Sequence, residues 1–249
     1  MPIVVCIPIY NAANAVNAVV EDLASIDWPK NVKFVFLDNR SIDQSVLRLK
    51  SAIIRNNLKN SEIYQNVENI GLGGSQKFAI EYGKSNGFDF MAIFHGDFQP
   101  TARDLEIGLG IIQKRKLDAL LGSRFEKNSV RHNYSKSRLW GNKTLNFMYS
   151  VRFRRKISDL GSGLNIYKIN SLPACKNLPN DLAFNCNLLV NQLKSKSHFE
   201  WFPIAWREGL APSSMKTIKL GLATLKPIFR LQDKHQEPSF SSKKLFEYE

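Results

Sequence analysis

Short apolar runs alternate with amphipathic stretches through most of the chain. The runs are rich in β-branched and aromatic residues and have the length of strands, whereas the stretches between them carry apolar residues at helical spacing. The predicted strands are 3–7, 33–37, 62–65, 90–94, 119–122, 164–168 and 199–203. The predicted helices are 13–25, 44–56, 74–85, 104–114, 135–155 and 182–194.

This alternation of strands and helices predicts an α/β fold with a mostly parallel central sheet flanked by helices. Ligands of such sheets bind in the crevice beyond the carboxyl ends of the strands. Polar segments follow three of the predicted strands, at 8–11, 38–41 and 95–100. We therefore expect these segments to form one site.

The chain of 249 residues is 43% hydrophobic, which is enough for a globular core. Lys and Arg number 35 against 22 Asp and Glu, giving a formal charge of +13. This charge favours an anionic partner, and nucleic acid, acidic lipid headgroups and phosphorylated substrates all fit it. A basic surface that is simply solvated is the ordinary alternative, and nothing in the sequence indicates an oligomeric state.

Residues 1–232 are predicted to form a single nucleotide-binding domain, and the polar residues 233–249 a loosely attached tail. Cys6, Cys175 and Cys186 form no paired motif, which favours reduced thiols and a cytoplasmic location. No apolar stretch is long enough to span a bilayer. The segment 215–226 has apolar residues at helical spacing with lysines between them, and could lie on an anionic membrane or pack on the core.

Asp38 closes a predicted strand, where a carboxylate can accept hydrogen bonds from a nucleobase or ribose. A turn-capping Asp is the alternative. His95, Asp97 and Gln99 alternate after a buried strand, and in extended backbone their side chains would converge on one cation. The alternative is a polar loop in which Asp97 caps the next helix.

These segments, taken in order, resemble family 2 glycosyltransferases of the GT-A fold, most closely the dolichyl-phosphate mannose synthase-like branch. The resemblance covers roughly residues 3–216. Its motifs are Pro8-Ile9-Tyr10-Asn11, Asp38-Asn39-Arg40-Ser41-Ile42-Asp43, Gly71-Leu72-Gly73-Gly74, His95-Gly96-Asp97-Phe98-Gln99, Gly122-Ser123-Arg124, Ser137-Arg138 and Asp159-Leu160-Gly161-Ser162-Gly163.

The resemblance implies an inverting transfer from a nucleotide diphosphate sugar to a polyprenyl phosphate or to a lipid-linked or cell-surface glycan, at the cytoplasmic face of a membrane. It implies nucleotide contacts from Pro8, Tyr10, Asn11, Asp38, Gly71 and Lys77. It assigns Mn²⁺ or Mg²⁺ to His95, Asp97 and Gln99. Phosphate groups would bind Arg124, Arg138 and Arg207, since guanidinium groups suit phosphate oxygens.

The implied catalytic residues are Asp97, Arg124, Arg138 and Asp159. If the acceptor is a hydroxyl, Asp159 is the candidate base; otherwise its carboxylate fixes a loop. For each arginine, the alternative role is an ordinary surface ion pair. We favour this alternative more strongly for Arg207 than for Arg124.

Three departures from the family pattern affect these assignments. His95 stands where the family has an acidic residue. Either the imidazole binds the cation, which favours Mn²⁺ over Mg²⁺, or the metal binds weakly. Asn39 and Arg40 replace Asp-Gly, and Asn165 replaces a frequent arginine. A catalytically silent nucleotide-sugar or glycan-binding module is therefore a second hypothesis. A nucleic-acid-binding protein is not favoured, because no nucleic-acid motif occurs.

Overall fold

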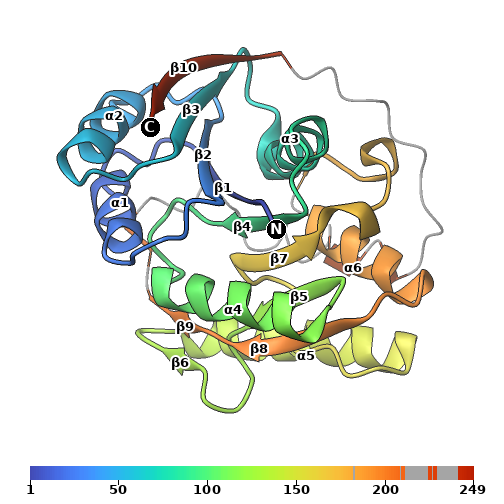
Figure 1. The fold of residues 1–249 in the computed structure, drawn as a ribbon. Helices are drawn as coiled ribbons and strands as arrows, with labels where there is room; N and C mark the ends of the chain where they lie inside the picture. The colour runs from blue at the N-terminus through green and yellow to red at the C-terminus, as the bar shows by residue number, and fades with distance from the viewer. Residues whose placement is uncertain (182, 208, 211–223, 226, 229–240) are drawn as a thin grey trace.

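The computed structural model describes residues 1–181, 183–207, 209–210, 224–225, 227–228 and 241–249. Its centre is an eight-stranded sheet with the order β10-β3-β2-β1-β4-β7-β5-β8 (Figure 1). The strands are β1 (Ile3–Ile9), β2 (Val32–Asp38), β3 (Ser61–Asn66), β4 (Phe90–Phe94), β5 (Ala119–Ser123), β7 (Leu164–Lys168), β8 (Phe199–Pro203) and β10 (Ser242–Tyr248). The helices are α1 (Val16–Ala24), α2 (Ser45–Arg55), α3 (Gly71–Ser85), α4 (Ala102–Arg115), α5 (Lys136–Phe153) and α6 (Phe184–Lys194).

Strands β3, β2, β1 and β4 are parallel neighbours. Strand β7 lies antiparallel between β4 and β5, so β5 has the same direction as β4, and β8 pairs parallel to β5. The carboxyl ends of β1, β2, β4 and β5 therefore meet at one edge. The prediction of a mostly parallel sheet flanked by helices is confirmed.

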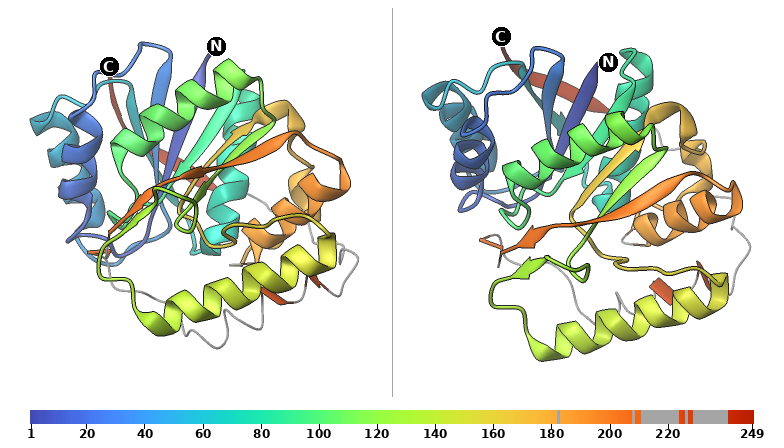
Figure 2. Two further views of the ribbon diagram at one scale, coloured as in Figure 1. Left: turned by 90° about the horizontal axis from the view of Figure 1, so that it is seen from below. Right: turned by 60° about the horizontal axis from the view of Figure 1, so that its bottom comes forward.

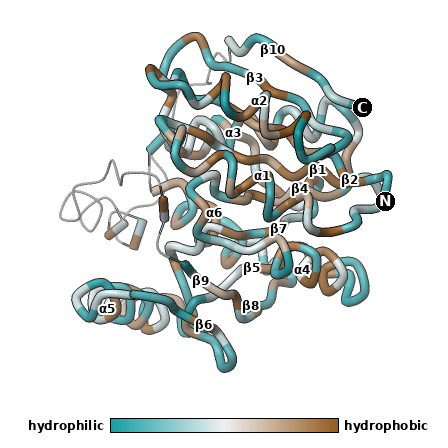
Figure 3. The backbone as a smooth tube through the Cα atoms, turned by 90° about the vertical axis from the view of Figure 1, so that its left-hand side faces the viewer, coloured by the Kyte–Doolittle hydropathy of each residue, from teal (hydrophilic) through white to brown (hydrophobic). Residues whose placement is uncertain are grey.

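Alternate residues of the central strands pack on opposite faces of the sheet. In β1, Ile3, Val5, Ile7 and Ile9 join the core under α1, α2 and α4, whereas Val4 and Cys6 join the core under α3 and α6. A strand buried on both faces needs a nearly continuous apolar sequence, which is why these runs stood out. Apolar colours accordingly gather in the central strands (Figure 3).

The prediction of a loosely attached tail is wrong for Ser242–Tyr248, because these residues form β10 and pair antiparallel with β3. Lys244 of β10 lies 2.7 Å from Glu62 of β3, and Lys33 of β2 reaches the same Oε1 atom at 2.7 Å. Tyr248 also donates a hydrogen bond to Asn57. This end of the chain is therefore an integral edge of the sheet.

Two features lie outside the main layers. A short parallel pair joins β6 (Val130–Arg131) to β9 (Ala205–Trp206). Helix α5 lies at the periphery of the molecule (Figure 2). The predicted amphipathic segment 215–226 falls almost wholly outside the described residues.

Glu62 gives the sheet edge a testable pH dependence. Burial alone would raise the pKa of Glu62, but hydrogen bonds from Lys244, Lys33 and Tyr82 outweigh burial and hold the pKa at about 2. We expect Glu62→Gln to lower the free energy of unfolding at pH 7 by about 2 kcal/mol, because it removes hydrogen bonds to a charged group.

A depressed carboxyl pKa stabilises the fold at neutral pH and ceases to do so as the pH falls through the folded pKa. The difference between wild type and variant should therefore shrink as the pH is lowered from the ordinary value of 4.5 to about 2. Urea unfolding across this range measures it. Exposed Glu68, changed to Gln, is the matched control. An equal loss at every pH would contradict the explanation.

Candidate active site at the carboxyl edge of the sheet

Asp38, the last residue of β2, has one carboxylate oxygen held by the protein and one left over. Its Oδ2 accepts hydrogen bonds from the Ser41 backbone N–H at 3.1 Å and from Gln65 Nε2 at 2.9 Å. Its Oδ1 is buried without a hydrogen-bond partner among the described residues. Buried polar atoms are almost always paired, so this oxygen is suited to a hydrogen-bond donor of a ligand.

A network of asparagine side chains fixes the loops beside Asp38. Asn39 donates to Asn69 Oδ1, while its own Oδ1 accepts from Asn66 Nδ2 and the Ile70 N–H. Asn69 in turn accepts from the Gly71 N–H. The ends of β2 and β3 are thereby tied to the start of α3. Sequence analysis missed this network, because scattered asparagines in turns carry no distinctive spacing.

The loop after β1 is tied to the loop after β2. The Asn11 N–H donates to Ser41 Oγ at 2.8 Å, and Asn11 Oδ1 accepts from the Ile42 N–H at 3.0 Å. Pro8 is half-buried, and Tyr10 is 41% exposed at the end of β1. These contacts place Pro8, at the end of β1, and the following residues Tyr10 and Asn11 beside the end of β2, which carries Asp38.

The glycines at 71–74 pack against the chain itself. A Cβ on Gly73 would lie within 2.7 Å of backbone atoms of Pro179, Asn180 and Asp181. Gly71 has a φ of +72° and meets the same segment. Their absence of side chains is therefore explained by close packing of residues 179–181 on the start of α3. Lys77 is buried in this helix, and burial lowers the pKa of its ammonium group.

Residues 95–99 form a turn and not an extended segment. Phe98 has a φ of +68°, in the left-handed region, and the Gln99 N–H folds back to Asp97 Oδ1 at 3.2 Å. The expectation that alternate side chains project to one face is therefore wrong in its geometry. Gln99 Nε2 packs against Gly209, while His95 packs against Gly163. The two side chains therefore pack against different segments of the chain.

His95 carries a ring nitrogen, Nε2, that is buried without a partner among the described residues. Burial lowers the pKa of His95, Asp97 acts in the opposite direction, and Arg124 lowers it further. The imidazole is therefore neutral at pH 7, the form in which it binds metal ions. Asp97 and Arg124 therefore lie near enough to His95 for their charges to act on its imidazole.

The turn at 95–99 contains few side chains that could bind a divalent cation. Within the described ranges, no group of three His, Cys, Asp or Glu side chains could hold a metal ion. Asp97 supplies one carboxylate and His95 one unpartnered nitrogen. Mg²⁺ is commonly held by one or two carboxylates together with substrate phosphates. The pair therefore fits a cation shared with a bound diphosphate and does not fit a cage built of protein alone.

Arg124, just after β5, forms a buried ion pair with Asp159. The guanidinium donates to Asp159 Oδ2 through Nε and to Oδ1 through Nη2, both at 2.7 Å. The Arg124 backbone N–H adds a bond to Oδ2, and the Gly161 N–H one to Oδ1. Asp159 is fully committed, so the alternative of a loop-fixing carboxylate fits it better than a base.

Aromatic rings surround the Arg124 guanidinium. Its Cζ lies 4.8 Å from the ring centre of Trp206 and 5.5 Å from that of Tyr134. Tyr134 also interacts electrostatically with Arg138, which is exposed in the first turn of α5. Burial raises the pKa of Tyr134, so its hydroxyl stays protonated. Tyr134 and Trp206 are site residues that sequence analysis missed, because their rings join the arginines only through tertiary packing.

The Arg207 side chain binds other parts of the protein near the turn at 95–99. Its Nη2 donates to Asp22 Oδ2 at 2.9 Å and to the Pro100 carbonyl at 2.7 Å, and its Cζ lies 3.7 Å from the Phe98 ring centre. A phosphate would have to displace these partners. The ion-pair alternative favoured for Arg207 therefore fits its placement better than phosphate binding.

A small pocket beside Asp159 is lined by Asn185, Leu189 and Gln192 of α6. Its lining includes Asn165, which stands where the resemblance expects an arginine, together with Gln192 and Trp201. Both amide atoms of Gln192 and the indole nitrogen of Trp201 are buried without a partner in the described part of the chain. Such atoms call for water or a polar ligand group in this cavity.

The predicted site residues therefore share one edge but fall into two groups. Asp38 and the 8–11 loop form the first group, at β2 and β1. His95, Asp97 and Arg124 form the second, at β4 and β5. Four strand positions separate β2 from β5, which corresponds to about 19 Å at the usual spacing of neighbouring strands. An elongated ligand could contact both groups at once.

Comparison with known sequences agrees with this fold. Residues 4–173 match the sequence model of the family described as Glycosyl transferase family 2. The chain is 22% identical over 210 residues to the dodecaprenyl-phosphate galacturonate synthase of Rhizobium johnstonii, covering 84% of this chain and 54% of that protein. It thus spans about half the length of this curated relative.

Solved structures share the fold at low identity. S. aureus TarS 1-349 in complex with UDP-GlcNAc has a TM-score of 0.58 and 19% identity, covering 87% of this chain and 62% of that one. Glucosyl-3-phosphoglycerate synthase from Mycobacterium tuberculosis, in complex with Mn²⁺, UDP and glucosyl-3-phosphoglycerate, has a TM-score of 0.65 and 13% identity, covering 91% and 77%. The fold is that of GT-A glycosyltransferases, and the chain belongs to glycosyl transferase family 2.

Proposed function

We propose that this chain transfers a sugar from a nucleotide diphosphate sugar to a polyprenyl phosphate, with inversion at the anomeric carbon. The observation that carries the proposal is the buried, unpartnered Oδ1 of Asp38, which lies two strand positions from the His95 and Asp97 turn on the same sheet edge. The nucleoside would bind beside Asp38, and the diphosphate would bind beside the turn that carries His95 and Asp97.

Asp38 is the group that selects the nucleoside in this proposal. A carboxylate oxygen accepts hydrogen bonds only, so its ligand must present an N–H or O–H, as a nucleobase edge or a ribose does. Gln65 and Ser41 hold the other oxygen and so fix the carboxylate plane. Pro8, Tyr10 and Asn11 on the adjacent loop would complete the pocket, and the glycine turn and Lys77 would lie beyond it.

The acceptor phosphate would lie beside Arg124 and Arg138. Arg124 is held rigid by Asp159, whereas Arg138 is exposed and free to meet an incoming phosphate. Asp159 acts as a positioning residue for Arg124 in this proposal. Because its carboxylate already accepts four hydrogen bonds, the site favours an acceptor that needs no base, and a phosphate is already anionic.

In the proposed step, an oxygen of the acceptor phosphate forms a bond to the anomeric carbon. The bond from that carbon to the donor diphosphate breaks on the opposite face, and the nucleoside diphosphate leaves with both electrons. A divalent cation held by Asp97 and His95 would supply charge stabilisation to this leaving group. The protein's own contribution is to fix donor and acceptor in line at the edge between β4 and β5.

The comparisons support the reaction class and the acceptor separately. Family membership supports sugar transfer. The relative named for dodecaprenyl-phosphate galacturonate supports a polyprenyl phosphate acceptor, and the Mycobacterium tuberculosis structure with Mn²⁺ and UDP supports a uridine donor and a divalent cation. The assignment of these partners to this chain remains our proposal.

The first test replaces the carboxylate of the turn. Asp97→Ala should lower kcat/KM for transfer to a polyprenyl phosphate by roughly 100-fold or more, because it removes charge stabilisation of the leaving group. Radiolabelled UDP-sugars assayed with and without Mn²⁺ measure the transfer, and circular dichroism checks the fold. Near-wild-type turnover would contradict the role of Asp97. Donor binding without turnover by the wild type would support the silent binding module instead.

The second test concerns His95. If its Nε2 reaches the cation, His95→Asp should keep transfer activity and shift the preference from Mn²⁺ towards Mg²⁺, because an oxygen replaces the imidazole nitrogen. Metal titrations of the initial rate for wild type and variant compare the two ions. An unchanged metal dependence would show that His95 has another role.

The third test separates the structural and functional roles of the buried ion pair. Asp159→Asn should lower the free energy of unfolding by about 3 kcal/mol, because the Arg124 charge is left buried without a partner. The double variant Arg124→Gln/Asp159→Asn should regain about half of this loss, since no charge remains. It should not regain transfer activity. Urea unfolding and the transfer assay are the two measurements, and full activity in the double variant would remove Arg124 from the phosphate site.

A further inference from the structure

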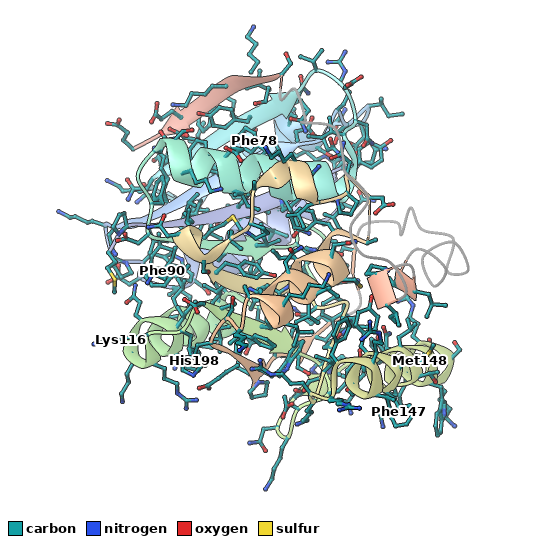
Figure 4. All side chains as sticks on the ribbon, turned by 90° about the vertical axis from the view of Figure 1, so that its right-hand side faces the viewer. Phe78, Phe90, Lys116, Phe147, Met148 and His198 are labelled. Carbon is teal, nitrogen blue, oxygen red and sulfur yellow. The ribbon has the colours of Figure 1, made fainter. Side chains whose placement is uncertain are left out.

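Helix α5 carries a stripe of apolar side chains on its outer face. Trp140, Phe147 and Val151 are 71%, 68% and 61% exposed. Their spacing of seven and four residues places all three on one side of a helix with 3.6 residues per turn. The stripe is about 16 Å long at the helical rise per residue. Figure 4 shows Phe147 on the side of α5 that faces away from the sheet.

The opposite side of the same helix is anchored to the domain. Asn146 donates to the Ser158 carbonyl at 2.6 Å and accepts from the Leu160 N–H at 3.2 Å. Tyr149 is fully buried and donates to the Thr224 carbonyl. The orientation of α5 is therefore fixed, and the exposed stripe is a consequence of the fold and not of a loose helix.

The charges on α5 indicate what could cover this stripe. The helix contains Lys136, Arg138, Lys143 and Arg152 and no acidic residue, and basic residues 154–156 follow it. Lys136 and Lys143 flank the stripe on one side. Aromatic residues with basic neighbours are the composition of helices that lie in the interface of an anionic bilayer. In the described part of the chain, no helix combines the length and the apolar character that a bilayer crossing needs.

We propose that the outer face of α5, formed by Trp140, Phe147, Val151, Lys136 and Lys143, docks onto an anionic lipid bilayer. The first turn of α5 carries Arg138, and Asn142 in the second turn donates to Tyr134, which contacts Arg124. Docking would therefore bring the arginines to the membrane surface, where a polyprenyl phosphate displays its headgroup. This last consequence rests on the proposed function, whereas docking itself does not.

The first experiment needs no variant. Trp140 is the exposed indole, since Trp28 and Trp201 are half-buried and Trp206 is buried. Vesicles of equal parts phosphatidylcholine and phosphatidylglycerol should shift the tryptophan emission of the full chain to the blue, and brominated lipid should quench it. Pure phosphatidylcholine should do so much less. Absence of both signals with anionic vesicles would overturn the proposal.

The second experiment maps the surface by vesicle sedimentation. Changing Trp140, Phe147 and Val151 together to Ser should weaken binding at least about tenfold, because their burial in the interface is lost. Changing Lys136 and Lys143 to Gln should cost about fivefold for each lysine and lower the salt dependence. The control changes Ile42, Leu47 and Ile54 to Ser. These are also exposed, but they lie at or near α2, on the other side of the molecule from α5 (Figures 1 and 3).

Equal binding by the stripe variant and the control would overturn the assignment to α5. Sedimentation velocity tests whether a second copy of the chain, and not a bilayer, covers the stripe. If the wild type forms a dimer and the stripe variant does not, the proposal is contradicted. Transfer assays keep the two proposals apart. The stripe variant should transfer normally to acceptor dispersed in detergent and poorly to acceptor in vesicles, whereas failure of the proposed function would abolish transfer in both and leave vesicle binding intact.

Discussion

A charge that is withdrawn from water must find an opposite charge or lose its ionisation, and the arrangement of the candidate site depends on how Arg124 meets this constraint. Burial alone would lower the pKa of this guanidinium, and Asp159 reverses that effect. The pair joins the end of β5 to the loop before β7, 35 residues later. Tyr134 and Trp206 pack around it, so the approach to α5 and the strand β9 take their positions from the same contact.

The same constraint gives different surroundings to the three arginines that the family resemblance assigns to phosphate groups. Arg207 is paired with Asp22 and holds the turn that carries Asp97, whereas Arg138 has its side chain in solvent. The Arg124 guanidinium is held in the site by Asp159, that of Arg207 helps to hold the turn at 95–99, and that of Arg138 is exposed to water. Arg138 can bind a phosphate without leaving a carboxylate, whereas Arg124 would have to contact a phosphate while keeping its ion pair with Asp159.

Much of the fold is predictable because local pattern and tertiary position coincide in a sheet that is covered on both faces. The runs at Ile3–Ile9 and Phe90–Phe94 are apolar for the reason that they are central. Strand β10 was not predicted, because its lysines are typical of a solvated tail. Their partner Glu62 lies nearly two hundred residues earlier in the sequence, so local pattern does not reveal the pairing. The positive φ of Phe98 and the pairing of Arg124 with Asp159 were missed similarly, since neither leaves a trace in local spacing.

The late strand β10 also decides what the border of the sheet presents to other molecules. Without it, β3 would expose a row of unpaired backbone groups, which is a template for intermolecular β-pairing and aggregation. With it, the outermost strand is one that bears Lys243 and Lys244 and has an irregular register between Lys244 and Phe246. The positive charge and the irregular pairing both oppose the addition of a further strand. Strand β10 therefore protects the edge of the sheet against intermolecular β-pairing.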